Sequence, residues 1–341
     1  MLPGVSVAEE LDCEVVFLVS RRGMHMVPSR YRKVLLRSVP LLGGGIRRKL
    51  SFYVLFLPAL LQSFAIMFSE RPRVVLGTGG YASFFPILAA RTLGICTAVQ
   101  EQNVAPGLAT RFLSRVANRV FLSFPESIRW LPPKKSRITG NPLRASIGKP
   151  DRAQGARFFG LDPSLHTVLL LGGSLGAGSI NRAFVDLLSL LPSSEQIQFI
   201  VISGEAEEQW VAREARSRSF TTLVFGFLEQ IEYAYAAADL VVARAGATTI
   251  AELIACGKPS ILVPYPHAGA HQHLNASVLQ KHCATRVIEN GKLSGNVLEE
   301  EIMSLIHDRR ALEQMSRNCE KLRKGNAARA VAEEIRRCSG T

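Results

Sequence analysis

Twice along this chain, a run of apolar, largely β-branched residues leads into a glycine-rich turn and then into a helical pattern. The first copy has its run at residues 73–76 and its turn at 77–81, and the second has them at 167–171 and 172–177. A strand, a tight turn and a helix in this order are the repeating unit of parallel α/β sheets. Because one copy stands in each half of the 341 residues, the sequence predicts an α/β protein with two domains.

Further apolar runs predict more strands, at residues 14–19, 96–100, 119–122, 198–202, 240–243 and 260–264. A helical pattern at residues 247–256 ends at two stop signals, Gly257 and Pro259. From about residue 298 to 337 the pattern is helical and charged. A turn cluster at residues 140–144 precedes a charged stretch and predicts the domain boundary.

The net positive charge is concentrated in the first half of the chain. Residues 1–150 hold 21 of the 41 Lys and Arg but only 7 of the 28 Asp and Glu, and the whole chain carries +13. This asymmetry predicts that the first half meets a polyanion, either nucleic acid or an anionic membrane. No basic-aromatic nucleic-acid motif is recognisable, which favours the membrane. A basic surface without a partner is the alternative.

Residues 50–68 are apolar enough to resemble a transmembrane segment. The segment contains Pro58 and three polar residues, and a predicted strand follows almost at once. We therefore predict a helix that packs on the sheet and is preceded by the basic cluster of Arg47, Arg48 and Lys49, with part of the helix dipping into the interface of an anionic bilayer. A core helix and a true membrane span are the alternatives.

Neither the cysteines nor the histidines have the spacing of a metal site. The six cysteines also form no short-range pairs, which indicates a reduced, cytosolic compartment. His267, His271 and His273 lack the H-E-x-x-H spacing and a neighbouring carboxylate. The amides of Gln272 and Asn275, which lie in the same stretch, fit the hydroxyls of a sugar better than a zinc ion.

Four loops that follow predicted strands could bind a ligand. The two glycine-rich turns suit phosphates, although a tight turn without a ligand is equally consistent with them. In residues 244–252, amides and Thr hydroxyls suit phosphate oxygens, and Glu252 suits the hydroxyls of a ribose. The alternative is Thr248 as an N-cap with Glu252 as a first-turn helix charge. Residues 101–103 follow another strand and are either functional or a solvated turn.

Taken together, these segments resemble the MurG family of glycosyltransferases. The matching pieces occur in family order across nearly the whole chain, at residues 77–81, 101–103, 140–144, 172–177, 244–252 and 271–275. The resemblance implies two Rossmann-like domains facing a cleft, the GT-B type of glycosyltransferase fold. It assigns acceptor and membrane binding to residues 1–143 and UDP-N-acetylglucosamine binding to residues 144–324. A C-terminal helix at about 325–341 would pack back on the first domain.

The resemblance also implies roles for single residues. Arg144 and Ser174 would contact the donor near its diphosphate, and Leu228 would lie against the uracil. Glu252 would hold the ribose hydroxyls, and Gln272 those of N-acetylglucosamine. The rest of the donor site would be Ala247, Thr248, Thr249, Ile250 and Ala251. The acceptor side would contain Gly79, Gly80, Tyr81, Glu101 and Asn103.

The implied reaction moves N-acetylglucosamine from its UDP donor to the muramyl 4-hydroxyl of lipid I, the undecaprenyl-linked muramyl-pentapeptide, and so forms lipid II of peptidoglycan. It is a single displacement with inversion at the anomeric carbon. Ser174, a helix dipole and Arg144 would stabilise the leaving UDP, without an obligatory cofactor or metal. No residue is identified as the general base.

The same resemblance implies where the enzyme works and with what. It would act at the cytoplasmic face of the bacterial inner membrane as a peripheral protein. Its partners would be lipid I, the anionic membrane surface and other cell-wall synthesis proteins, and nucleic acid is not expected among them.

The family pattern also has a first strand and a Gly-Gly-Thr-Gly-Gly-His turn, and residues 1–11 resemble the helix that follows them. We therefore expect the first strand of the N-terminal domain to be missing and the chain to be an incomplete version of the working enzyme. Two alternatives stay open. The protein is another UDP-sugar lipid glycosyltransferase, or it binds a nucleotide sugar but has lost catalysis.

Overall fold

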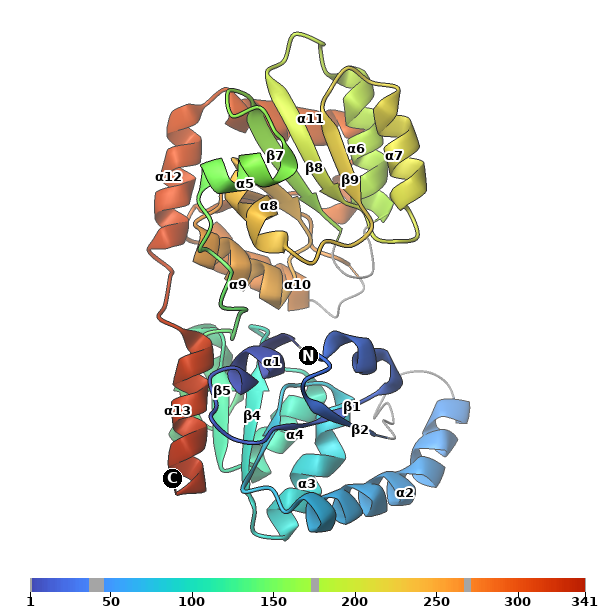
Figure 1. Cartoon of the computed structure of the whole chain (residues 1–341), viewed down its shortest axis with the longest axis vertical. Coiled ribbons are helices and arrows are strands. Elements are labelled where there is room, and N and C mark those ends of the chain that lie inside the picture. The colour runs from blue at the N-terminus through green and yellow to red at the C-terminus, as the bar shows by residue number, and fades with distance from the viewer. Residues whose placement is uncertain (1, 37–45, 173–177, 267–270, 341) are drawn as a thin grey trace. The chain divides into compact units, whose positions relative to one another are not determined.

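The computed structural model describes residues 2–36, 46–172, 178–266 and 271–340. The chain divides into two compact units (Figure 1). The first unit contains Met1–Arg144 and Lys324–Thr341, and the second contains Ala145–Arg323. Both are built from parallel sheets covered by helices, which confirms the predicted α/β class.

The first unit contains two parallel sheets. Four strands pair in the order β3 (Val74–Gly77), β4 (Cys96–Glu101), β5 (Arg119–Leu122) and β6 (Ser136–Ile138). A separate sheet pairs β1 (Val16–Val19) with β2 (Arg32–Leu35). The strands predicted at residues 14–19, 96–100 and 119–122 are therefore present, whereas β2 and β6 were not predicted.

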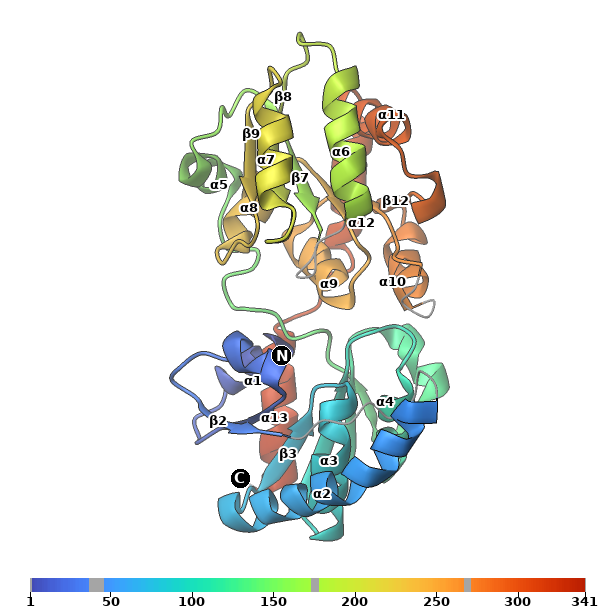
Figure 2. The same ribbon diagram turned by 90° about the vertical axis from the view of Figure 1, so that its right-hand side faces the viewer.

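Helices cover both faces of the four-stranded sheet. They are α1 (Leu2–Ala8), α2 (Ile46–Glu70), α3 (Phe84–Thr92), α4 (Leu108–Val116) and α13 (Ala327–Ser339). Val99 of β4 packs with residues of α2, α3 and α4, whereas its neighbour Ala98 packs with residues of α1 and α13. These helices are labelled in Figure 2. Neighbouring side chains of a strand point to opposite faces, so the two helical layers lie on opposite sides of the sheet.

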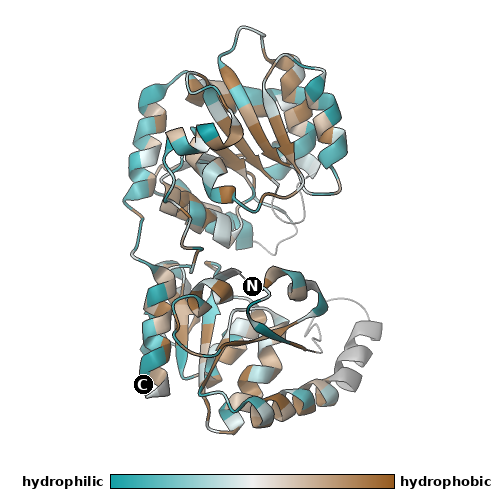
Figure 3. Cartoon of the chain, viewed as in Figure 1, coloured by the Kyte–Doolittle hydropathy of each residue, from teal (hydrophilic) through white to brown (hydrophobic). Residues whose placement is uncertain are grey.

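The second unit is built on one six-stranded sheet. Its strands, in spatial order, are β12 (Thr285–Val287), β11 (Ser260–Leu262), β10 (Leu240–Ala243), β7 (His166–Leu171), β8 (Ile197–Ile202) and β9 (Thr222–Phe225). Every pairing is parallel. The central strands β10, β7 and β8 are mostly hydrophobic, as is typical of parallel strands covered on both faces (Figure 3). Polar residues occur near the starts of β7 and β8, at His166, Thr167 and Gln198.

The helices of the second unit are α5 (Arg152–Phe159), α6 (Gly178–Leu190), α7 (Glu208–Arg216), α8 (Ile231–Ala237), α9 (Ala247–Cys256), α10 (His271–Gln280), α11 (Gly295–Ile306) and α12 (Arg309–Glu320). Residues of α6, α7, α11 and α12 share the main core with β7 and β8. On α5, Gly155 touches the backbone of α8, because a Cβ there would lie 2.5 Å from the Ala237 nitrogen. The charged pattern at 298–337 forms parts of three helices, separated at the N-caps Asp308 and Asn326.

Cys96 at the start of β4 forms a disulfide with Cys338 of α13, across 242 residues of sequence. The cysteine pattern indicated a reduced compartment, in which disulfides are rare, so this bond was not predicted. Cys256 and Cys319 are free thiols in the second unit. Burial raises the pKa of each to about 12.

One side of α2 is apolar and exposed. Ala59 on the inner side is buried against α3, while Leu57, Leu61 and Phe68 are 58%, 58% and 64% exposed. Positions four and seven residues apart share one helix face. In the part of the chain that the structure describes, no helix is long and apolar enough to cross a membrane. The side chains of Arg47, Arg48 and Lys49 lie outside the described residues.

Candidate active site

The six strands of the second unit run in the same direction, so their carboxyl ends meet at one edge of the sheet. Open α/β sheets bind ligands at this edge. Leu228 follows β9, α9 follows β10, and Gln272 lies in α10 after β11. The parallel order therefore brings these predicted donor residues to one edge. Ser174 lies outside the described residues, and Arg144 belongs to the first unit.

Arg244, directly after β10, connects the loops of this edge. Its guanidinium donates hydrogen bonds to the Val263 carbonyl at 3.0 Å, to Asn290 Oδ1 at 2.8 Å and to Ser179 Oγ at 2.6 Å. It also lies 5.4 Å from the centre of the Tyr265 ring. Burial lowers the pKa of Arg244, although a guanidinium keeps its charge at any physiological pH. The sequence reasoning gave this residue no role because its partners lie 19 to 65 residues away.

The start of α9 presents backbone N–H groups at the same edge. Gly246 is the N-cap, with an extended backbone (φ −65°, ψ 144°) and no side-chain cap hydrogen bond. The alternative prediction of Thr248 as the N-cap is therefore wrong, because the helix begins one residue before it, at Ala247. A helix N-terminus carries positive partial charge, and its first amides suit the oxygens of a phosphate.

Glu252 is held by a buried phenol. It lies in the second turn of α9, so it is not the first-turn charge of the alternative prediction. One of its carboxylate oxygens accepts a hydrogen bond from the Tyr235 hydroxyl at 2.9 Å, and Tyr235 is only 1% exposed. Glu252 itself is partly exposed. The hydrogen bond orients the carboxylate while leaving part of it accessible from the surface.

Two amide side chains of α10 behave differently. Gln272 is partly exposed, and its Oε1 accepts a hydrogen bond from the Tyr265 backbone N–H at 2.8 Å. Asn275 is fully buried and donates to the Ala245 carbonyl at 3.2 Å, so it links α10 to the loop before α9. No group of three or more metal-ligating side chains occurs among the described residues. Gln272 is therefore the amide of the pair that has exposed surface for a ligand.

In the first unit, the turn after β3 depends on two glycines. Gly79 and Gly80 have φ values of +85° and +73°, the left-handed region that favours glycine. Ser83 Oγ donates to the Gly79 carbonyl at 3.0 Å, and Gln102 Nε2 donates to the Thr78 carbonyl at 2.8 Å. Tyr81, next in the chain, is 37% exposed. The turns after β3 and β4 are thus joined at the carboxyl edge of this sheet.

Glu101 fixes the loop after β4. It is the last residue of the strand and 4% exposed, so it is not part of a solvated turn. Its Oε1 accepts from the Asn103 backbone N–H at 2.9 Å and from Asn103 Nδ2 at 3.3 Å. Ser127 Oγ donates to the Asn103 carbonyl at 3.1 Å. Glu101 therefore positions Asn103, which is partly exposed.

Known proteins resemble the chain across both units. Residues 1–122 match the glycosyltransferase family 28 N-terminal domain, and residues 167–335 match the family's C-terminal domain. The UDP-N-acetylglucosamine--N-acetylmuramyl-(pentapeptide) pyrophosphoryl-undecaprenol N-acetylglucosamine transferase of Thermodesulfovibrio yellowstonii is 36% identical over 325 residues, which cover 92% of this chain and 89% of that protein. The transferase of the same name from Syntrophus aciditrophicus is 39% identical, over 89% of this chain and 86% of that protein. The crystal structure of Acinetobacter baumannii MurG matches with a TM-score of 0.76 and 26% identity, over 98% of this chain and 95% of that one.

Proposed function

Because the chain belongs to the MurG family of glycosyltransferases, we propose that it transfers N-acetylglucosamine from UDP-N-acetylglucosamine to lipid I. The product is lipid II, the precursor of peptidoglycan. The observation that carries this proposal is the identity of 36–39% with transferases of that name over most of the chain. The carboxyl edge of the second unit supports it, because groups suited to a phosphate, a ribose and a sugar lie there together.

The donor binds to the second unit in this proposal. The first amides of α9, from Ala247 to Thr249, take phosphate oxygens, and Ile250 and Ala251 complete that turn. Glu252 accepts hydrogen bonds from the ribose hydroxyls, with its carboxylate oriented by Tyr235. Gln272 contacts the hydroxyls of the sugar, and Leu228 lies against the uracil. Arg144 and Ser174 contribute at the diphosphate.

The proposed mechanism of sugar transfer follows from where negative charge develops during the reaction. The muramyl 4-hydroxyl attacks the anomeric carbon, the bond to the UDP oxygen breaks, and the configuration inverts. Negative charge grows on the leaving diphosphate as the bond breaks. The N–H groups at the start of α9 are already oriented toward this charge and so stabilise the transition state more than the ground state. Arg244 keeps the surrounding segments in place, because its guanidinium donates hydrogen bonds to Val263, Asn290 and Ser179.

The acceptor binds to the first unit in this proposal. The glycine turn at Gly79 and Gly80 lets an anion approach the backbone closely, which suits the pyrophosphate of a lipid-linked sugar. Asn103 and Tyr81 contact the acceptor, and Glu101 acts by positioning Asn103.

The exposed face of α2 is the proposed contact with the membrane. Leu57, Leu61 and Phe68 enter the interface of the bilayer, and the basic cluster at residues 47–49 meets anionic headgroups. In this proposal the enzyme works as a peripheral protein at the cytoplasmic face of the bacterial inner membrane, where it meets lipid I.

A transfer assay tests the function directly. The purified chain is incubated with radiolabelled UDP-N-acetylglucosamine and lipid I in detergent, and label in the lipid fraction is measured. We expect labelled lipid II, and no label when lipid I is omitted. Transfer of a different UDP-sugar, or to a different lipid but not to lipid I, would point to another lipid glycosyltransferase.

A second candidate function is donor binding without catalysis. The two separate sheets of the first unit favour it, because the turn after β3 lies next to a sheet edge that has no second strand among the described residues. Calorimetry with UDP, run beside the transfer assay, separates the two candidates. Binding of UDP without formation of lipid II supports this second function.

A further inference from the structure

The disulfide between Cys96 and Cys338 fixes the last turn of α13 to the start of β4. Along the sequence, it closes a loop that contains the whole second unit. The Cα atoms of the two cysteines lie 6.2 Å apart, within the range of about 4.4–6.8 Å that a disulfide spans. The folded backbone therefore keeps the two thiols within reach of each other when the bond is reduced.

The proposed function places this bond in a compartment where disulfides are rare. A peripheral enzyme at the cytoplasmic face of the membrane is exposed to the pool of small thiols that keeps cysteines reduced. A disulfide in such a compartment is usually transient and senses the redox state. Cys96 and Cys338 are both partly exposed, whereas the free thiol of Cys319 is fully buried. The Cys96–Cys338 bond is thus accessible to small thiols and suited to exchange with them.

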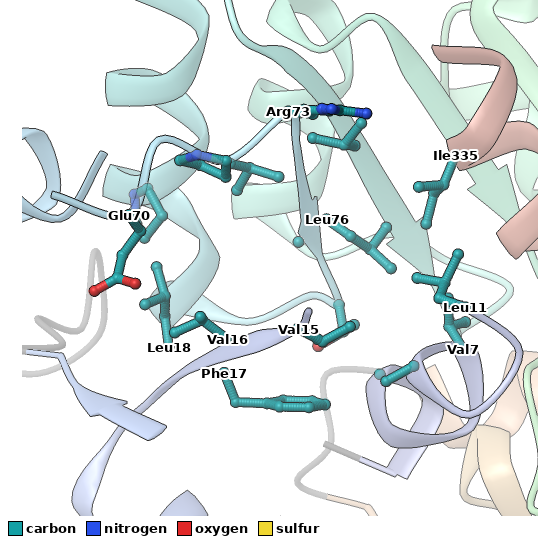
Figure 4. Close-up of a pocket in the computed structure, with 18 of the residues that line it drawn as sticks. Val7, Leu11, Val15, Val16, Phe17, Leu18, Glu70, Arg73, Leu76 and Ile335 are labelled. Carbon is teal, nitrogen blue, oxygen red and sulfur yellow. The ribbon is translucent and has the colours of Figure 1, made fainter. Parts of the chain in front are cut away.

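The carboxyl end of α13 is the part of the helix that packs least on the sheet. Val331 and Ala332, in the middle of the helix, are both 0% exposed. One turn before Cys338, Ile335 still packs in the same apolar cluster, beside a cavity of about 1130 Å³ (Figure 4). Beyond it, Arg337 is exposed. The disulfide therefore fixes an end of the helix that apolar packing alone holds weakly.

The first turn of α13 supports the loops at the carboxyl edge of the same sheet. A Cβ on Gly140 would lie 3.1 Å from the Cβ of Ala327, so the loop and the helix are in close contact. The Gly140 carbonyl accepts a hydrogen bond from Gln100 Nε2 at 3.2 Å, and Gln100 precedes Glu101 in β4. Glu101 positions Asn103. A shift of α13 therefore changes the support of the proposed acceptor loop.

We propose that Cys96 and Cys338 form a redox-controlled clasp, which closes by exchange with a small disulfide such as oxidised glutathione. One cysteine thiolate attacks the glutathione disulfide, which releases one glutathione and leaves a mixed disulfide. The second cysteine thiolate attacks the protein sulfur of this mixed disulfide and releases the second glutathione. The two cysteines are oxidised, one glutathione disulfide is reduced to two thiols, and two protons pass from the cysteines to glutathione.

The closed clasp fixes α13 and so strengthens binding of the acceptor, whereas reduction frees the end of the helix. This inference rests on the proposed function for the compartment and for the acceptor. Its structural part, the reversible attachment of α13, is measured without any substrate.

The first test equilibrates the full chain in glutathione buffers that range from fully reduced to fully oxidised. Free thiols are then alkylated in denaturant, and the digested chain is analysed by mass spectrometry. We expect a peptide that links Cys96 and Cys338 in oxidised buffer and its complete loss in reduced buffer. A bond that glutathione does not reduce, or that never forms, overturns the proposal.

The second test compares the oxidised and reduced chains by thermal melts and amide hydrogen exchange. The oxidised chain should unfold at a midpoint at least about 5 °C higher, and its α13 should exchange more slowly. Cys338→Ser should remove both differences, whereas Cys13→Ser, at an exposed free thiol of the same unit, should retain them. Equal exchange of α13 in the two states of the unmodified chain overturns the proposal, even if Cys338→Ser fails to fold.

Transfer kinetics distinguish failure of this inference from failure of the proposed function. The KM for lipid I should be at least about fivefold lower in the oxidised chain. The Kd for UDP should stay the same, because α13 belongs to the first unit. Equal KM values in the two states overturn control of acceptor binding by the clasp. If neither state forms lipid II, the proposed function fails, and the exchange of α13 still decides whether the clasp operates.

Discussion

Removal of the Glu252 carboxylate should weaken UDP binding without unfolding the second unit. A carboxylate that accepts hydrogen bonds from ribose hydroxyls forms charge-assisted bonds, which are stronger than neutral ones. Glu252 is partly exposed, so water competes for its carboxylate and weakens this contribution. We expect Glu252→Ala to cost roughly 1–3 kcal/mol, or about 5- to 150-fold in Kd.

The hydrogen bond from Tyr235 provides the matched control. Tyr235→Phe removes only the hydroxyl that orients the carboxylate, and it should lower the free energy of unfolding by about 1 kcal/mol. The acceptor for the ribose is still present in this variant. Its Kd for UDP should therefore rise by less than about threefold.

Calorimetry with UDP and with its 2′-deoxy and 3′-deoxy analogues completes a double-mutant cycle. In the unmodified chain, loss of a ribose hydroxyl should weaken binding, whereas in Glu252→Ala it should have little further effect. Equal losses in the two chains would refute contact between Glu252 and the ribose. A large loss of UDP binding in Tyr235→Phe would instead indicate that the pair acts through the fold.

Three further predictions concern other parts of the molecule. Leu57→Gln with Leu61→Gln should reduce co-sedimentation with anionic vesicles, and unchanged binding would contradict the role of α2; Leu190→Gln, an exposed leucine of the second unit, is the control. Gly155→Ala should lower the free energy of unfolding in urea by about 2 kcal/mol, because its Cβ would meet the backbone of α8, whereas Gly291→Ala, in open space, should not. The second unit should lose stability as the pH rises from 9 toward 12. The buried thiol of Cys256, with its pKa raised to about 12, stays neutral in the folded state while it ionises in the unfolded chain, so Cys256→Ala should flatten this loss in thermal melts at successive pH values.

Local patterns predicted the central elements of the fold but not its edges. The strand at residues 240–243 and the helix at 247–256 have the predicted bounds, because a continuous apolar run and clear stop signals mark them. β2 was missed because two of its four residues are the charged Arg32 and Lys33, and because β1 is its one strand partner in the part of the chain that the structure describes. Edge strands need less apolar surface, so their sequences resemble loops.

The residues of the candidate site were predictable by motif, but their connections were not. The segment at residues 244–252 was singled out from its composition after an apolar run. The bonds of Arg244 to Ser179 and of Tyr235 to Glu252 join elements that only the folded sheet brings together. Sequence periodicity describes neighbours along the chain, so it contains no information on such pairs.

The return of α13 to the first unit has a consequence for how the protein is made. During synthesis, the second unit leaves the ribosome complete, and domains generally fold as units in the order in which they emerge. The first unit emerges earlier but lacks α13, so the face of its sheet that carries Ala98 and Phe121 is covered by α1 but not by α13 until residues 327–339 are translated. The unit that begins the chain is therefore the last to be completed, and its apolar face needs protection in the meantime.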